Sequence, residues 1–260
     1  MQSPRSVGIG VAVFAAMATM SNTAAAAIIR VTVENLAPTN SISFAPLRVG
    51  FNNGTYDSFD NGGTATAPII SVAEGGSGAD WFPAFSAADP TATLGTVVPS
   101  PAGPLMPGAT GQEVFDVDES INPYFTFAAM AVPSNDYFIG NDSPTQYELL
   151  DSSGNLNFNE IVLTASDLWD AGSEVDGVFG AAFLQGSSND DRVADTDVVS
   201  FDFGDLSVFN GSTTAAGYVF DSQLAADTQV YRISFAAVPE PTTGVAMLLS
   251  MAGAALWRRR

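Results

Sequence analysis

Apolar and polar side chains alternate with a period of two in several short stretches of this chain. In residues 29–34 every second position is Ile or Val, and in 229–237 the side chains of Tyr231, Ile233 and Phe235 share one face. This period is typical of a strand with one face buried and one face in water. The pattern therefore predicts strands near both ends of the sequence.

Six further stretches have the composition of strands, and the segments between them are rich in Gly, Pro, Ser, Asn and Asp. The six are 42–51, 113–117, 124–132, 157–164, 198–203 and 218–220. Only 68–74 and the neighbourhood of Trp81 suggest a short helix, and the five prolines of 90–107 predict an extended surface loop. Many short strands with polar turns favour an all-β fold, an antiparallel β-sandwich with long loops and a short helix.

The first 27 residues have the order of a secretory signal peptide. Arg5 precedes an apolar run from Val7 to Met20, and small residues follow up to Ala27. A positive start, a short apolar middle and small residues at the exit are the features of such a signal. A buried first helix is the alternative. We therefore expect a single folded domain over 28–237.

The last 23 residues combine Pro239-Glu240-Pro241, an apolar stretch from Gly244 to Trp257, and three terminal arginines. As a helix, the apolar stretch would be about 21 Å long, which is short for a transmembrane helix across roughly 30 Å of hydrocarbon. The three parts in this order resemble the PEP-CTERM sorting signal of Gram-negative bacteria. The resemblance implies recognition by an exosortase and export to the cell surface or an exopolysaccharide matrix. An ordinary tail anchor is the alternative.

Composition narrows the chemistry that the domain can perform. The chain has no cysteine, histidine or lysine, which excludes thiolate catalysis, disulfides, Ser-His-Asp triads and Schiff bases. Residues 28–237 carry four arginines against 27 carboxylates, a net charge of −23. Nucleic acid is therefore excluded as a partner, and so is anionic lipid bound through a basic face. The remaining oxygen ligands suit calcium and carbohydrate.

Two acidic motifs stand out. In 130–142 an apolar run ends at Pro133 and is followed by Asp136, and in 167–174 Asp170 and Glu174 lie four residues apart across a turn of small residues. Calcium takes six to eight hard oxygen ligands, and carboxylates that converge on loops would supply several of them. The spacing alone leaves two interpretations open, a calcium site and solvated turns.

The same motifs resemble the spondin N-terminal domain family. Residues 127–140 are similar to its Met-x-x-Pro-Ser-x-Asp-aromatic-Phe-x-Gly signature and 168–177 to its Trp-Asp-Ala-Gly-Thr-Asp segment. The opening of the domain at 31–38 also agrees, and 71–75 resembles the family's Ala-Glu-x-Gly element. The resemblance covers about 30–235. It implies a C2-like β-sandwich and a calcium ion held by Asp136, Asp170 and Glu174. The family has Asp where this chain has Glu174, which adds a methylene, and the disulfides of its animal members are absent here.

Other acidic and aromatic groups have a plainer interpretation. The run of aspartates in 189–205 lacks the Gly and terminal Glu of an EF-hand loop, so a solvated loop is favoured over a second calcium site. Six aromatics could stack on sugars, although burial in the core is the simpler expectation for them. They are Trp81, Phe82, Phe85, Trp169, Phe179 and Phe183.

Together these observations favour an exported calcium-binding adhesion or structural module without catalysis. Its partners are expected to be exopolysaccharide or surface proteins, with exosortase as the processing enzyme and membrane contact only through the terminal helix. A calcium-dependent exopolysaccharide-binding lectin is one alternative. A polysaccharide-active enzyme that uses two carboxylates, for instance Asp136 and Glu174, is another.

Overall fold

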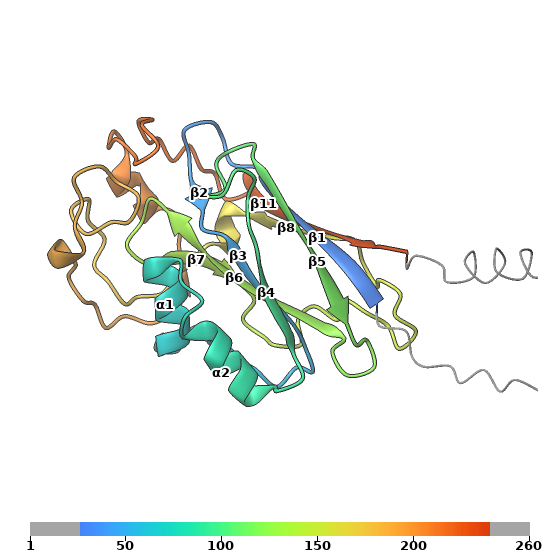
Figure 1. The fold of residues 1–260 in the computed structure, drawn as a ribbon. Helices are drawn as coiled ribbons and strands as arrows, with labels where there is room; N and C mark the ends of the chain where they lie inside the picture. Colours follow the sequence, from blue (N-terminus) through green and yellow to red (C-terminus); the bar gives the residue numbers. More distant parts are fainter. Residues whose placement is uncertain (1–26, 240–260) are drawn as a thin grey trace, which may run out of the picture.

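The computed structural model of the chain describes residues 27–239 (Figure 1). The predicted signal peptide and sorting segment lie almost wholly outside these residues. Eleven strands form two antiparallel sheets, and two α-helices and three short 3-10 helices accompany them. The strands are β1 (Ala27–Asn35), β2 (Ser43–Phe44), β3 (Leu47–Asn52), β4 (Thr93–Val97), β5 (Thr110–Val117), β6 (Tyr124–Val132), β7 (Tyr137–Gly140), β8 (Glu160–Thr164), β9 (Trp169–Asp170), β10 (Ser200–Phe201) and β11 (Gln229–Ala237). The helices are α1 (Ala67–Gly75), α2 (Trp81–Ala88), η1 (Ala165–Asp167), η2 (Asn189–Asp191) and η3 (Asp205–Phe209).

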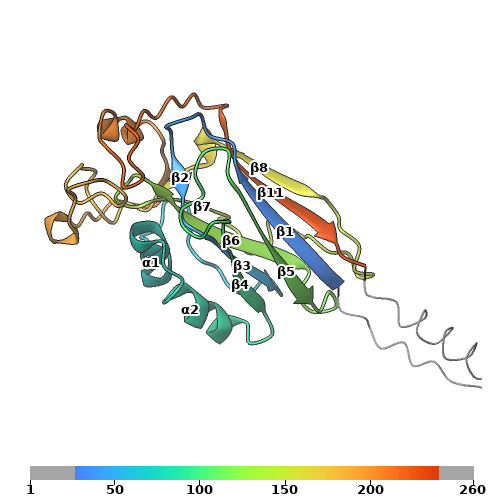
Figure 2. The same cartoon turned by 45° about the horizontal axis from the view of Figure 1, so that its top comes forward.

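The two sheets face each other as an all-β sandwich. The smaller sheet has the order β5-β1-β11-β8, and the larger runs β10-β9-β7-β6-β3-β4, with β2 paired to β6. In Figure 2 the helices α1 and α2 lie on the outer face of the larger sheet, away from β1 and β11. The predicted all-β fold class is thus confirmed.

Strand β6 is buried on both faces, so the outer face of the larger sheet must be covered by α1 and α2. Its residues after Tyr124 are all buried, and they alternate between two apolar clusters. Phe127 and Ala129 pack into the core between the sheets, whereas Ala128 packs under the helices with Trp81 and Phe85. A strand that is buried on both faces has a continuous apolar sequence rather than an alternating one. The helix residues Trp81 and Phe85 are therefore core and not a sugar platform.

Several sequence predictions change in detail. The predicted strand 42–51 is divided at Pro46 into β2 and β3, because proline has no N–H to donate to the sheet. The predicted loop 90–107 contains β4, which pairs with β3, and the predicted strand 218–220 is only an isolated bridge from Val219 to Thr213. The strand β7 was not predicted at all, because its four residues are too short to show a period.

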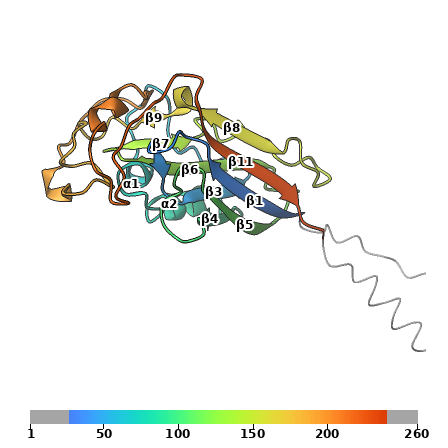
Figure 3. The same ribbon diagram turned by 90° about the horizontal axis from the view of Figure 1, so that it is seen from above.

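The ends of the described chain and its longest loops lie at opposite ends of the sandwich. Strands β1 and β11 are antiparallel neighbours, and Ile29 pairs with Ala237, so the two ends leave the domain side by side (Figure 3). The connections between β9 and β11 gather at the other end of the molecule, as the gold and orange segments of Figure 1 show. Both predicted acidic motifs are found toward this loop-rich end.

Candidate functional site

The turn between β6 and β7 places Asp136. The hydroxyl of Ser134 donates to the carbonyl of Ala131 at 2.5 Å and accepts from the N–H of Tyr137 at 3.2 Å, which fixes the turn from both sides. Asp136 directly precedes β7 and is 1% exposed. The sequence predicted a carboxylate at the tip of a strand, and the structure buries this carboxylate under the loop after β9.

The two oxygens of the Asp136 carboxylate have different surroundings. Oδ2 accepts from the N–H of Ser173 at 2.7 Å, the N–H of Glu174 at 3.0 Å and the Ser173 hydroxyl at 3.1 Å. Oδ1 is buried and has no hydrogen-bond partner. Burial raises the pKa of Asp136, while the three donors from Ser173 and Glu174 oppose that rise. A buried acceptor without a donor costs about 1–3 kcal/mol, so Oδ1 is a destabilising group in the protein alone.

Asp170 lies on the neighbouring strand. In the pairing of β7 with β9, Tyr137 is opposite Asp170 and Phe138 is opposite Trp169. Oδ1 of Asp170 accepts from the N–H of Gly172 at 2.7 Å. Burial, and next the negative charge of Asp136, raise the pKa of Asp170 to about 7. The structure therefore brings Asp136 and Asp170 into one electrostatic environment, as the sequence predicted.

Asp176 joins them; it lies within the second motif segment 168–177 but was not predicted to be a ligand. Its Oδ2 accepts from the Tyr137 hydroxyl at 3.1 Å, and its Oδ1 is buried without a partner. The pKa of Asp176 is raised to about 6. Burial is the main cause, the Tyr137 hydrogen bond opposes the rise, and the charge of Asp136 adds to it. The only signal in the sequence was its position two residues after Glu174. Asp136, Asp170 and Asp176 are called the acidic cluster below.

The carboxylate of Glu174 belongs to a different group. Although its N–H bonds to Asp136, its Oε1 lies 3.2 Å from Arg192, which is also 3.3 Å from Glu74 of α1. Burial, and next the charge of Glu74, raise the pKa of Glu174 to about 7, while Arg192 opposes the rise. The Ser173 hydroxyl bonds to both Asp136 and Glu74, so the two groups are adjacent. The backbone N–H of Glu174 thus contacts Asp136, whereas its carboxylate forms an ion pair with Arg192.

Charge compensation distinguishes the two groups. The ion pairs within residues 27–239 join Arg192 to Glu74 and Glu174, and Arg232 to Glu34 and Glu160. None of them reaches the acidic cluster. A buried carboxylate without a countercharge is strongly destabilising unless it takes up a proton or a cation. The acidic cluster therefore favours binding of a positive ion.

The fit of the acidic cluster to a metal ion is partial. In the part of the chain that the structure describes, no three Asp or Glu side chains converge closely enough to hold a metal by themselves. The donor chemistry does fit, because Asp136 and Asp176 each have one buried oxygen without a donor. Calcium mixes carboxylates with carbonyl oxygens and water, so one or two carboxylates can suffice.

The sequence matches no protein-family model and no curated protein. The resemblance to the spondin N-terminal domain therefore stays a prediction that depends on the motifs at 127–140 and 168–177. Between residues 27 and 239 no helix combines the length and the apolar character that a membrane span needs. The terminal apolar stretch, where the transmembrane helix was predicted, lies outside the described residues.

Proposed function

We propose that the protein is an exported, non-catalytic calcium-binding module of a bacterial cell surface or extracellular matrix. The observation that carries the proposal is the Asp136 carboxylate, which is almost fully buried, has one oxygen without a donor and forms no ion pair with an arginine of the described chain, while its charge raises the pKa of Asp170 and Asp176. A cation at the acidic cluster would supply the missing positive charge. The export part of the proposal depends on the terminal sequences 1–27 and 238–260.

Calcium is favoured over other metals by the available ligands. The chain has neither cysteine nor histidine, so zinc, copper and iron would lack their usual protein ligands. Carboxylate, carbonyl and hydroxyl oxygens remain, and these are the ligands of calcium and magnesium. Calcium tolerates irregular geometry, whereas magnesium requires a near-ideal octahedron. An arrangement in which three carboxylates do not converge symmetrically is therefore better suited to calcium.

Asp136 would act as the central ligand and also as the connection between two loops. Its Oδ2 holds the N–H groups of Ser173 and Glu174, so the segment that carries the second motif is fastened to the β6–β7 turn. Asp170 and Asp176 are the next candidates, and Glu174 stays a predicted ligand whose charge is shared with Arg192. Bound calcium would neutralise the buried charge and stabilise the loops at this end of the sandwich.

The position of the site suits a surface module. The described chain ends leave together at one end of the sandwich, and the acidic cluster lies toward the other (Figure 1). If the C-terminal segment directs the protein to the cell surface, the calcium-stabilised loops would face outward. This arrangement supports adhesion to exopolysaccharide or surface proteins as the function of the loops.

The proposal is tested by thermal unfolding and calorimetric titration of the full chain. We expect calcium to release or absorb heat and to raise Tm, and we expect Asp136→Asn to abolish both effects. With calcium at 100 times its Kd, the gain is about 2.7 kcal/mol. Asp227→Asn is the matched control, because Asp227 is exposed and makes no side-chain contact that the structure records. Absence of a calcium effect, or an equal effect in both variants, contradicts the proposal.

A further inference from the structure

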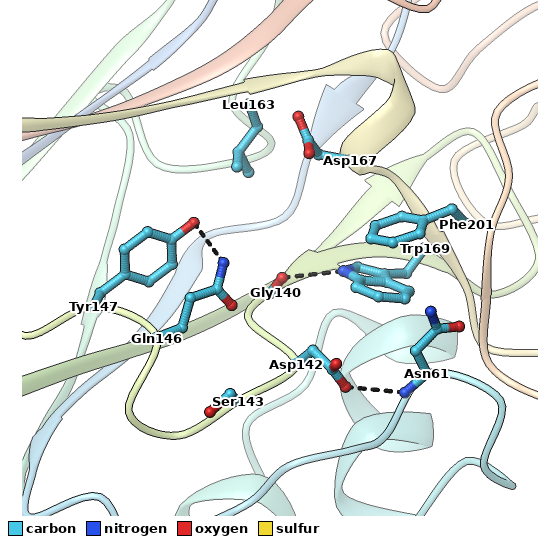
Figure 4. Close-up of a pocket in the computed structure, with 10 residues that line it drawn as sticks. All are labelled: Asn61, Gly140, Asp142, Ser143, Gln146, Tyr147, Leu163, Asp167, Trp169 and Phe201. Atoms are coloured by element: carbon cyan, nitrogen blue, oxygen red, sulfur yellow. Dashed lines mark hydrogen bonds between the residues drawn. The ribbon is translucent and has the colours of Figure 1, made fainter.

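A concave site lies at the edge of the larger sheet, and it shares no residue with the acidic cluster. It is a pocket of about 370 Å³ between the edge of the larger sheet and the segment after β7 (Figure 4). This volume is within the range of about 300–1,000 Å³ that small-molecule sites occupy. Three aromatic residues (Tyr147, Trp169 and Phe201) and several polar side chains line the pocket.

Two of the aromatic rings, those of Trp169 and Phe201, are stacked on each other. The rings of Trp169 on β9 and Phe201 on β10 have centroids 3.6 Å apart and an interplanar angle of 24°. The indole N–H of Trp169 donates to the carbonyl of Gly140 at 3.0 Å, which fixes the orientation of the ring. Phe201 nevertheless is 51% exposed, on the last strand of the sheet. Trp169 is only 3% exposed, so Phe201, held in place by stacking on the buried indole, supplies the open aromatic surface at low entropic cost to a ligand.

The polar side chains of the pocket present hydrogen-bond acceptors whose positions are fixed by other contacts within the protein. Oδ1 of Asp142 accepts from the N–H of Asn61 at 2.9 Å, and Oδ2 of Asp167 accepts from the N–H of Thr164 at 2.7 Å. Gln146 donates through Nε2 to the Tyr147 hydroxyl at 3.1 Å. Within the described chain, the second oxygen of each carboxylate and the amide oxygen of Gln146 accept no hydrogen bond. Figure 4 shows Gln146 across the space from the Trp169–Phe201 pair, with Asp167 next to Phe201 and Asp142 next to Trp169.

Such a pocket matches the chemistry of a sugar ring. Acceptors that are held in place at the surface of a pocket can bind a ligand with several hydroxyl donors, and O–H to carboxylate hydrogen bonds are short and strong. The stacked aromatics require an apolar face, which the C–H groups of a pyranose ring provide. Two carboxylates in a domain of net charge −23 repel anionic ligands. We propose that this pocket binds an uncharged saccharide by direct contact, without a metal ion.

The inference goes beyond the proposed calcium function, although the two sites share strand β9. Trp169 contributes to the pocket, and the next residue, Asp170, belongs to the acidic cluster on the opposite face of the strand. Successive side chains of a strand point to opposite faces. Strand β9 would therefore contribute one residue to each site, and a substitution can disrupt either site without the other.

The test is a panel of immobilised neutral oligosaccharides, followed by calorimetric titration of the full chain with the best ligand in EDTA. We expect Phe201→Ala and Gln146→Ala each to weaken binding by about tenfold or more, which corresponds to about 1.4 kcal/mol. Phe179→Ala and Gln112→Ala are the matched controls, because both residues are exposed and lie outside the pocket. We expect them to leave the Kd within about twofold.

The outcomes separate the two proposals. Asp136→Asn should abolish the calcium effect and leave saccharide binding in EDTA unchanged, whereas Gln146→Ala should do the reverse. Gln146 is exposed, so this variant tests the pocket even if Phe201→Ala does not fold. The pocket proposal is overturned if no neutral oligosaccharide binds, if only uronic-acid oligomers bind, if EDTA abolishes binding, or if both pocket variants bind as the controls do.

Discussion

At the scale of single residues, the most informative property of this protein is the state of its buried carboxylates. Burial raises the pKa of Asp136. It also raises the pKa of Asp170 and of Glu174 to about 7 and that of Asp176 to about 6. In an unfolded chain these groups ionise near pH 4. Between the two ranges the folded protein therefore holds more protons than the unfolded chain. The free energy of unfolding must then decrease as the pH rises through this window.

We therefore predict that the metal-free protein is more stable near pH 5 than near pH 8. The effect should appear between about pH 4 and pH 8, because it begins at the unfolded pKa values and is complete above the folded ones. Thermal unfolding in EDTA measures it, and each kcal/mol corresponds to about 2–4 °C in a domain of this size.

Replacement of one titrating group provides the control for this pH effect. Asp170→Asn should flatten the pH dependence, because it removes one of the groups that titrate near pH 7. Asp227→Asn should leave the pH dependence unchanged. A Tm that is constant or that increases from pH 5 to pH 8 would contradict the explanation from buried carboxylates.

At the scale of elements, the short strand β9 and the turn after it organise the site. Gly172 has φ +63, and a Cβ at this position would lie 2.7 Å from the carbonyl carbon of Asp197. The position therefore requires glycine for its backbone conformation and also for the close approach of a second loop. The N–H of Gly172 also donates a hydrogen bond to Oδ1 of Asp170 and so fixes this carboxylate.

We predict that Gly172→Ala lowers the free energy of unfolding by about 2–4 kcal/mol, from left-handed strain and from the backbone clash. It should also weaken calcium binding, because the turn would carry Asp170 and Ser173 away from Asp136. Gly177→Ala is the matched control, since nothing lies within 4 Å of its Cβ position. Its effect should stay within about 1 kcal/mol in urea unfolding. Equal effects of the two substitutions would show that the turn is not constrained.

At the scale of the whole molecule, charge is the dominant feature. A net charge of −23 over residues 28–237 creates repulsion that any salt screens, so a rise in Tm with calcium is not by itself evidence of a site. A specific site must give more stabilisation than screening does.

We predict that millimolar calcium raises Tm more than sodium chloride at equal ionic strength, and more than magnesium at equal concentration. In Asp136→Asn, the calcium and sodium chloride curves at equal ionic strength should coincide. Differential scanning calorimetry of both proteins measures this. If the curves coincide in the unmodified protein as well, calcium acts by screening alone.

The sequence by itself determined the fold class and several elements. Strands β6 and β11 were predicted with the same ends as the structure shows, because continuous apolar and alternating patterns are local consequences of burial. The turn residue Pro133 and the acidic character of both motifs were also evident. Composition excluded thiol, imidazole and amine chemistry without reference to any structure.

Only the tertiary structure decided what each acidic and aromatic side chain contacts. The burial of Asp136, the pairing of Glu174 with Arg192 and the entry of Asp176 into the acidic cluster depend on contacts between residues 18 to 39 positions apart. The Trp169–Phe201 pair likewise joins two strands of two residues each, which are too short to show a period. A local pattern specifies which face of an element is buried, but the partners across the site are chosen by long-range packing.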